Sequence, residues 1–359
     1  MRLAIAKAAL HESLKRRRPP EQVQRILIAH HLLLGDTLML TPLLAALRSR
    51  HPDAHITMAG PKAFVPLYAT RPYAVLAIGW DPRDRASLRA LQDQGPYDLA
   101  IIPAETRHGW LARAAGAAWV RAFAGDKWRY RAAIDEEVPI PATPSTLSDM
   151  TVRLTLSPFA GRYQKSDWPA PPSEPFAQPT APYVVLHLGA GSPLKYWPAA
   201  HWRTVALELA QQGFTIVLST GAGQEHLARD VDPAGRYRWY AGSLTLAQLW
   251  RLVEGARLLV LPDTGVLHLA KLTLTPTVAL FGPGNATLFA PGAFFQDMAY
   301  RAVTTDIRCR DESVLFNRHI PWLKTCQRLP NACPFDAQCS RQIEPQAVMA
   351  AAQDLLAAK

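Results

Sequence analysis

Residues able to bind phosphate gather where a predicted strand passes into a predicted helix. The apolar run 259–261 is typical of a buried strand, and Asp263, Thr264 and Gly265 follow it at the start of a helical pattern. The first turn of a helix presents backbone N–H groups without intrahelical partners and the positive end of the helix dipole. We therefore expect this junction to bind phosphate, with His268 one turn into the helix.

A second predicted strand follows at once and ends in glycine. Residues 277–281 form an apolar run, and Gly282-Pro283-Gly284 comes directly after it. Two consecutive strand ends that carry glycine and polar residues are typical of a ligand crevice at the carboxyl edge of a parallel sheet.

The elements that position these residues alternate between strand and helix through most of the chain. Such alternation predicts an α/β fold in which helices cover both faces of a parallel sheet. In the first half we expect strands at 25–29, 55–59, 75–78 and 97–102 and helices at 42–50 and 84–94; in the second half we expect strands at 183–188 and 214–219 and a helix at 198–212.

A proline-rich segment separates the two halves. Six of the sixteen residues in 167–182 are proline, which predicts a stiff, extended linker. The length of 359 residues is enough for two domains of ordinary size. We expect a basic arm at 1–20, domains at 21–166 and 183–342, and a final helix within 343–359.

The composition is that of a soluble globular protein. Hydrophobic residues make up 49% of the chain and charged residues 19%, which excludes a disordered chain. No window offers the roughly 18 uninterrupted apolar residues of a transmembrane helix. The N-terminal apolar stretch is broken by Lys7, His11, Glu12 and Lys15, which is unlike a signal peptide. Cytoplasmic residence is therefore the expectation.

About half of the net charge of +10 lies at the N-terminus. Residues 1–20 hold six Lys or Arg and one acid, Glu12. Two interpretations stay open: a solvated arm, or a basic amphipathic helix that makes peripheral contact with anionic lipid at the inner membrane. Because the remaining positive charge is scattered and no nucleic-acid-binding motif is present, we expect no nucleic-acid partner.

The junction and the strand after it resemble a known family. Residues 263–270 read DTGVLHLA and residues 276–282 read PTVALFG. This resembles the D-T-G-x-x-H-x-A and P-T-[VI]-x-[LI]-[FW]-G motifs of glycosyltransferase family 9, the ADP-heptose heptosyltransferases of lipopolysaccharide assembly. The resemblance implies a GT-B fold, in which two Rossmann-like domains face each other across a cleft and the last helix packs back on the first domain. It also implies an acceptor-binding first domain and a nucleotide-sugar-binding second domain.

A second match places a carboxylate after the first strand. Residues 35–42 read GDTLMLTP, similar to the family's G-D-x-[LV]-x-x-T-P signature, whose Asp is the proposed general base. Asp36 is the matching residue. Glycosyl transfer needs such a group, because the acceptor hydroxyl loses its proton as it attacks the anomeric carbon. The alternative is that Asp36 caps the N-terminus of the following helix.

A third match concerns the segment after the strand 183–188. Residues 189–198 read GAGSPLKYWP, and the resemblance implies that Lys195 binds the diphosphate of the donor and stabilises the leaving group. Gly189 and Ser192 belong to the same donor-binding segment, and the Ser192 hydroxyl is a candidate donor to the phosphates. We expect Trp197 to pack in the core beneath this segment.

The resemblance also assigns the remaining donor contacts. In similar proteins a Glu near residues 219–226, which read STGAGQEH, contacts the ribose, and Glu225 is the best candidate. Its carboxylate could instead be an ordinary first-turn acid that favours the helix dipole. Asp263, Thr264, Gly265 and His268 complete the expected donor-binding set.

All four cysteines fall within 31 residues near the C-terminus: Cys309, Cys326, Cys333 and Cys339. Clustered cysteines in a cytoplasmic protein favour a metal, and four thiolates suit structural zinc or iron. Related heptosyltransferases have cysteine-rich segments here, and those that modify autotransporters carry iron. Free thiols and disulfides stay open as alternatives, because the spacing lacks a CxxC pair. The proposed chemistry itself needs no cofactor.

The function implied is inverting transfer of heptose from ADP-heptose to a cell-envelope acceptor, a phosphorylated glycolipid such as lipopolysaccharide core or another glycan. Three alternatives remain: a UDP- or other NDP-sugar donor, a protein acceptor, and a non-catalytic nucleotide-binding protein. A GxGxxG fingerprint is missing, which argues against an NAD-dependent dehydrogenase.

Overall fold

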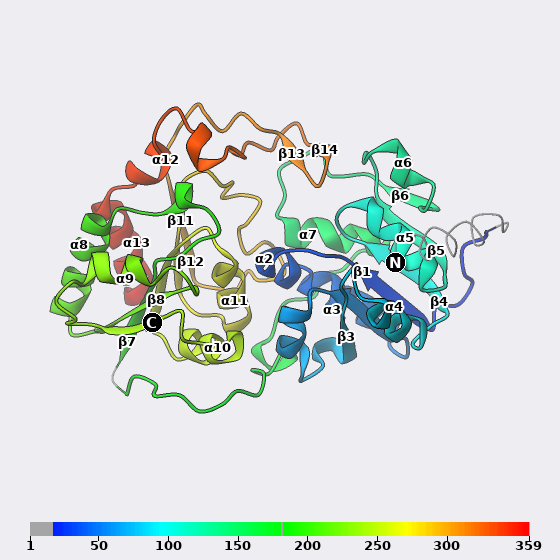
Figure 1. Ribbon diagram of the computed structural model, residues 1–359, viewed down its shortest axis with the longest axis horizontal. Helices are drawn as coiled ribbons and strands as arrows, with labels where there is room; N and C mark the ends of the chain where they lie inside the picture. Colours follow the sequence, from blue (N-terminus) through cyan, green and yellow to red (C-terminus); the bar gives the residue numbers. More distant parts are fainter. Residues whose placement is uncertain (1–16, 181, 359) are drawn as a thin grey trace. The chain divides into compact units, whose positions relative to one another are not determined.

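The computed structural model describes residues 17–180 and 182–358, and its contacts divide the chain into two compact units (Figure 1). Unit 1 runs to Pro171 and also contains Gly292–Phe294 and Ser313–Trp322. Unit 2 contains Pro172–Pro291, Phe295–Glu312 and the chain from Leu323 onwards. Most of the expected basic arm, residues 1–16, lies outside the described residues.

Unit 1 is built on a six-stranded parallel sheet of order β3-β2-β1-β4-β5-β6. This is the strand order of the classic dinucleotide-binding fold. Its elements are β1 (Arg25–Ala29), α2 (Leu34–Leu38), α3 (Thr41–Arg50), β2 (His55–Gly60), the 3₁₀ segments η1 (Lys62–Tyr68) and η2 (Pro72–Ala74), β3 (Val75–Gly79), α4 (Arg85–Gln92), β4 (Tyr97–Ile102), η3 (Thr106–His108), α5 (Gly109–Ala114), β5 (Ala117–Phe123), α6 (Trp128–Arg131), β6 (Glu136–Val138), α7 (Leu147–Val152), η4 (Arg153–Thr155) and η5 (Lys165–Asp167).

Unit 2 repeats this architecture with a six-stranded parallel sheet of order β12-β11-β10-β7-β8-β9. Its elements are β7 (Tyr183–His187), η6 (Pro193–Lys195), α8 (Ala199–Gln211), β8 (Thr215–Thr220), α9 (Glu225–Val231), β9 (Arg238–Ala241), α10 (Leu246–Glu254), β10 (Leu258–Pro262), α11 (Gly265–Thr273), β11 (Thr277–Phe281), β12 (Tyr300–Thr304), η7 (Pro330–Ala332), α12 (Gln338–Arg341) and α13 (Pro345–Ala357).

The central strands are apolar because helices cover them on both sides. Every residue of β7, β10 and β11 is buried. Figure 1 shows α8, α9 and α13 on one face of the unit 2 sheet and α10 and α11 on the other. The predicted strands and helices of both halves are observed, with ends that differ by a few residues.

The final helix packs within unit 2. Helix α13 contacts α8, β10, β11 and β12, and its residues Val348, Met349, Ala352 and Leu355 belong to the apolar core of unit 2. Its apolar stripe covers the face of the unit 2 sheet beside α8. The expectation that this helix also packs back on the first domain stays a prediction.

One stretch of the expected second domain belongs to unit 1. In the hairpin of β13 (Val314–Leu315) and β14 (Arg318–His319), the buried Arg318 side chain donates to the carbonyl oxygens of Ala104, Phe123 and Ala124. Trp322 donates to the carbonyl oxygen of Pro141. The expected second domain at 183–342 thus includes residues that pack in unit 1.

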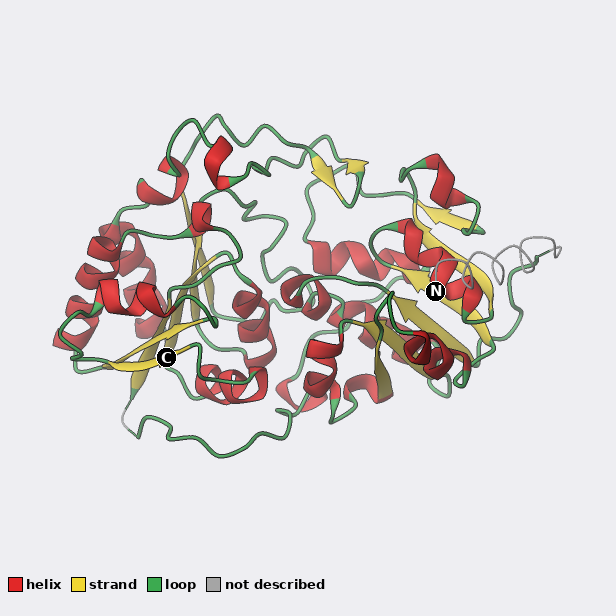
Figure 2. Ribbon diagram, viewed as in Figure 1, coloured by secondary structure: helices red, strands yellow, loops and turns green. Residues whose placement is uncertain are grey.

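The proline-rich segment after η5 forms neither helix nor strand in its described residues, and Figure 2 draws it as a loop. Among the helices of residues 17–180 and 182–358, none has the length and apolar character needed to span a lipid bilayer.

Acid should destabilise unit 2 through His187 at the end of β7. Its side chain is buried beside the Ser219 hydroxyl at 2.7 Å, and burial lowers its pKa to about 4. Below about pH 6.5 His187 binds a proton in the unfolded chain but stays neutral in the folded chain. The free energy of unfolding is therefore at its full value above that pH and falls as the pH drops toward 4. The expected contribution is at most about 1.4 kcal/mol per pH unit.

Calorimetric melting between pH 7 and pH 4.5 measures this slope. His187→Gln should make the loss of stability with acid less steep, whereas His55→Gln, at an exposed position, should leave it unchanged. An equal slope in the wild type and His187→Gln would contradict the assignment.

Candidate functional site

Four loops meet at the carboxyl edge of the unit 2 sheet. They follow β11, β10, β7 and β8, which are consecutive neighbours in the sheet. Side-chain contacts join three of them: the Lys195 ammonium lies 2.7 Å from Asp263 Oδ2, and the Gln224 amide donates to the carbonyl oxygen of Ala190 at 2.7 Å. The predicted strand-end motifs of unit 2 are therefore brought together, as the topology requires.

The pair of Lys195 and Asp263 has an asymmetric environment. The Asp263 side chain is 5% exposed and that of Lys195 is 28% exposed. A buried carboxylate is stable only with a partner that compensates its charge. Lys195 is therefore held in place from one side, while its ammonium group still reaches solvent.

Gly284 makes room for this pair. A Cβ atom at Gly284 would lie 2.2 Å from Asp263 Oδ2, far closer than van der Waals contact allows. Residue 284, after β11, must therefore be glycine if the Asp263 carboxylate, after β10, is to keep its position.

The loop that carries Lys195 is fastened from the C-terminal segment. Ser340 in α12 donates to the carbonyl oxygen of Leu194 at 2.7 Å, and Trp197 donates to the carbonyl oxygen of Ile343 at 2.8 Å. Trp197 is buried, as expected for a side chain that packs beneath the loop. Ser192 accepts a hydrogen bond from the Leu194 N–H at 3.3 Å and so caps η6.

Helix α11 starts beside the ion pair. Thr264 is its N-cap in an extended conformation without a side-chain cap bond, and Gly265 is its first residue. His268 is buried, and its Nδ1 has no hydrogen-bond partner in the described part of the chain. Burial and the positive charges of Lys271 and Lys195 hold the pKa of His268 well below its ordinary value, so the ring is neutral at physiological pH.

Glu225 begins α9 and is exposed. Its carboxylate accepts a hydrogen bond from the Gly223 N–H at 2.9 Å, and backbone N–H groups lower its pKa. It is a first-turn acid, as one interpretation held, and it remains accessible to a ligand. Gly189 lies nearby, because a Cβ there would be 2.1 Å from Gln224 Oε1.

Asp36 lies in unit 1, within the short helix α2 after β1. The alternative that Asp36 caps the following helix is wrong, because the N-cap of α3 is Leu40 and that of α2 is Leu33. Gly35 is a helical residue with no left-handed conformation. The Asp36 side chain is half-buried.

Sequence reasoning missed three residues of the site in unit 2. Gln224 ties two loops together, Ser340 fastens a third, and Gly284 admits the Asp263 carboxylate. Gln224 and Gly284 lie in segments that follow predicted strands. That position is the feature of the sequence from which their part in the site could have been predicted. Nothing in the sequence marks Ser340, because its partner is a backbone carbonyl 146 residues away.

The expected metal centre at the four cysteines is not formed. Residues 17–180 and 182–358 contain no group of three or more His, Cys, Asp or Glu side chains arranged to hold a metal ion. Cys309, Cys326, Cys333 and Cys339 are free thiols, so the disulfide alternative also fails. Cys326 and Cys333 accept hydrogen bonds instead, from Arg328 and from the Ala337 N–H.

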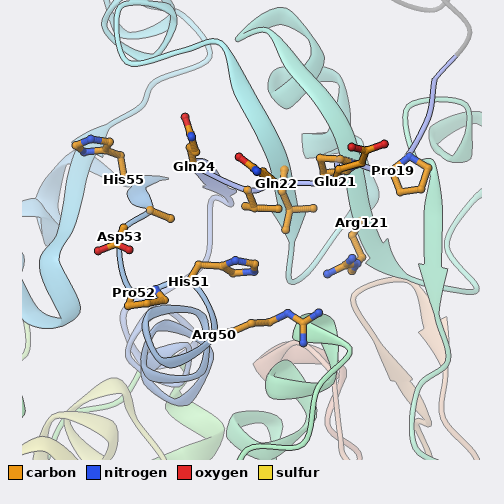
Figure 3. Close-up of a pocket in the computed structure, with 14 residues that line it drawn as sticks. Pro19, Glu21, Gln22, Gln24, Arg50, His51, Pro52, Asp53, His55 and Arg121 are labelled. Atoms are coloured by element: carbon orange, nitrogen blue, oxygen red, sulfur yellow. The ribbon is translucent and has the colours of Figure 1, made fainter.

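A ligand-sized cavity of about 620 Å³ lies elsewhere, at the amino ends of β1 and β2 (Figure 3). Arg50, His51 and Arg121 line it, together with residues 19–24. It includes none of the predicted site residues. The candidate site stays at the carboxyl edges of the sheets, where parallel α/β folds bind their ligands.

Replacing Gly284 should disturb the ion pair. We expect Gly284→Ala to displace the Asp263 carboxylate and to lower the free energy of unfolding by about 1–3 kcal/mol, the usual effect of overpacking. Gly191→Ala is the matched control, because nothing lies within 4 Å of the added Cβ, and it should change stability by less than about 0.5 kcal/mol. Denaturant unfolding compares the two; equal stabilities would argue against the close approach.

Comparisons with known proteins relate the chain to one family. The sequence profile of glycosyltransferase family 9 (heptosyltransferase) matches residues 89–311. Lipopolysaccharide heptosyltransferase 1 of Pseudomonas aeruginosa is 31% identical over 206 residues, which cover 53% of this chain and 55% of that protein. Lipopolysaccharide heptosyltransferase 2 of Salmonella typhimurium is 27% identical over 312 residues, which cover 74% of this chain and 85% of that protein.

The fold has a solved counterpart. The structure of the Escherichia coli ADP-heptose lipopolysaccharide heptosyltransferase II has a TM-score of 0.67 at 21% identity and covers 93% of this chain and 99% of its own. The expected GT-B fold, with two Rossmann-like units, is confirmed. This chain belongs to glycosyltransferase family 9 (heptosyltransferase) and is a glycosyltransferase.

Proposed function

We propose that this enzyme transfers heptose from ADP-heptose to a phosphorylated glycolipid such as lipopolysaccharide core, with inversion at the anomeric carbon. The observation that carries the proposal is the Lys195–Asp263 pair beside the start of α11, at the carboxyl edge of a Rossmann-like sheet. Two relatives named as lipopolysaccharide heptosyltransferases support the donor and the acceptor class.

The leaving diphosphate would sit between Lys195 and the first turn of α11. A cation and helix N–H groups both favour negative charge there. As the bond between the anomeric carbon and the diphosphate oxygen breaks, charge grows on the diphosphate, and a prepositioned ammonium stabilises it more than it stabilises the ground state. Asp263 would act on Lys195 by holding it in place.

The remaining donor groups fit a nucleoside diphosphate. Glu225 is exposed and ionised, and its carboxylate can accept hydrogen bonds from both ribose hydroxyls. The neutral ring of His268 can donate a hydrogen bond to phosphate without adding a charge. Gly189, Ser192, Thr264 and Gly265 would complete the pocket through their backbone and hydroxyl groups.

Asp36 would be the general base. The acceptor hydroxyl attacks the anomeric carbon, its proton passes to the Asp36 carboxylate, and ADP leaves with the electron pair of the broken bond. A carboxylate in this role contributes typically about 10²–10⁴-fold to the rate. No step calls on a metal ion.

Lys195→Ala should lower kcat by about 10²–10³-fold, because one preorganised charge-stabilising group is lost. Transfer from ADP-heptose to heptose-deficient lipopolysaccharide measures this. Lys324→Ala, at an exposed position of unit 2, is the control and should keep wild-type turnover.

Wild-type turnover by Lys195→Ala would remove Lys195 from the mechanism. Calorimetric titration of ADP and UDP tests the donor in parallel: tighter binding of ADP supports ADP-heptose, while tighter binding of UDP keeps the mechanism and replaces the donor. A protein acceptor is the remaining variant of the proposal, and it predicts no transfer to the lipopolysaccharide.

We further propose that the enzyme acts in the cytoplasm and makes peripheral contact with the inner membrane. Trp128 in α6 is 83% exposed, and its neighbours Lys127 and Arg129 are exposed as well. Tryptophan and basic residues together favour an anionic lipid surface. Arg17, at the end of the basic arm, pairs with Asp135 at 2.9 Å, shortly after α6.

Removing this basic-aromatic patch should weaken binding to vesicles of phosphatidylglycerol and phosphatidylethanolamine. Each basic residue near an anionic surface contributes about 1 kcal/mol, or roughly fivefold in affinity. The triple variant Lys127→Gln, Trp128→Ala, Arg129→Gln should therefore sediment with vesicles more than tenfold less well. Leu207→Ala, at another exposed apolar position, should bind as the wild type does. Unchanged vesicle binding by the triple variant would show that this patch does not contact the membrane.

A further inference from the structure

Three residues that line one small cavity of unit 1 each have a buried polar atom without a partner among the described residues. These atoms are His30 Nε2, Thr37 Oγ1 and the Tyr68 hydroxyl. All three side chains line the same cavity, whose other walls are mostly apolar. Their residues are at most 3% exposed. Buried polar groups are nearly always hydrogen-bonded, so this grouping calls for an explanation.

The cavity lies at the carboxyl edge of the unit 1 sheet. His30 directly follows β1, Gly60 ends β2, and both line the cavity. Thr37 comes from α2 and Tyr68 from the end of η1. Three separate segments thus contribute polar side chains to the lining of one cavity, and one of these segments is the helix that carries Asp36.

The protonation of His30 can be deduced from its neighbours. Its Nδ1 accepts a hydrogen bond from the Leu32 N–H at 3.3 Å, so Nδ1 carries the lone pair. Burial and the nearby His108 and His31 lower the pKa of His30 to about 3, so the ring is neutral. The single proton of a neutral ring must then be on Nε2, which is a donor without a partner among the described residues, in a side chain that lines the cavity.

The cavity has room for one water molecule. Its volume is about 10 Å³, roughly what one water requires when polar partners are available. Buried waters typically make about three hydrogen bonds. Here the water oxygen would accept from His30 Nε2, and the two hydroxyl groups would supply the remaining bonds, since each both donates and accepts.

We propose that a buried water molecule bridges His30, Thr37 and Tyr68 and thereby positions the Asp36 carboxylate. Helix α2 has five residues and no side-chain cap, so it depends on tertiary contacts for its orientation. Adjacent residues of a helix point about 100° apart. Fixing Thr37 toward the cavity therefore fixes Asp36 away from it, where its half-buried carboxylate can meet an acceptor. Thr37, His30 and Tyr68 are positioning residues.

This inference rests on Asp36 being the base, so its test separates the two ideas. Tyr68→Phe and Thr37→Val each remove one hydroxyl with little change of shape. We expect each to lower kcat roughly three- to tenfold, the effect of one hydrogen bond, with the Kd for ADP unchanged because ADP binds in unit 2. Thr37→Ser should restore most of the activity.

Two controls exclude a general loss of stability. Tyr97→Phe removes a buried hydroxyl that donates to the carbonyl oxygen of Leu91 at the other end of the sheet. It should lower the melting temperature while kcat stays at the wild-type value. In an Asp36→Asn background, Tyr68→Phe should cause no further loss, because a positioning residue acts only through the group that it positions.

A crystal structure at high resolution tests the water directly. Electron density for one water within hydrogen-bond distance of all three atoms is expected. A dry cavity, or unchanged kcat in both Tyr68→Phe and Thr37→Val, would overturn the inference. An equal loss from Tyr68→Phe with and without Asp36 would also overturn it. Full activity of Asp36→Asn would instead reject Asp36 as the base. The presence of the water would then still be decided by the electron density.

Discussion

The candidate donor site depends on one requirement: the buried carboxylate of Asp263 needs a cation beside it. Taking a carboxylate out of water is costly unless an opposite charge and hydrogen bonds compensate. Lys195 supplies that charge from the neighbouring loop at 2.7 Å, and Gly284 leaves the space in which the carboxylate lies. The same pair that stabilises the folded edge therefore holds in place the ammonium group that we propose to bind the diphosphate. The folded structure and the proposed chemistry thus both depend on the ion pair of Lys195 and Asp263.

The C-terminal segment gives this edge its rigidity. Ser340 fixes the backbone before Lys195, Ile343 accepts from Trp197, and α13 joins the core beneath. A loop alone would leave Lys195 to sample many rotamers, which would weaken its interaction with a developing charge. Packing of the C-terminal segment in unit 2 thus has a direct consequence for the loop that carries Lys195.

The sequence was informative where local pattern and tertiary environment agree. The apolar runs at β10 and β11 are buried on both faces, so their composition alone marks them as central strands, and the motif residues necessarily follow them. Prediction failed where a partner is distant in sequence. Ser340 donates to a backbone carbonyl 146 residues away, and the five-residue helix α2 has no side-chain cap and buries Thr37 and Leu38. None of these partners is visible in a local window.

The cysteine-rich segment shows how composition can mislead. Four cysteines within 31 residues suggest a metal, yet the described residues contain no group arranged to hold one. The hairpin of β13 and β14, which lies between Cys309 and Cys326, is held by an arginine. Arg318 is buried in unit 1, donates to three carbonyl oxygens at the ends of β4 and β5, and lies 3.9 Å from Asp126. A guanidinium group has five N–H donors in a fixed plane, so it can satisfy several strand-end carbonyls at once. These contacts hold the hairpin in unit 1, while Cys326 and Cys333, which follow it, accept weak hydrogen bonds.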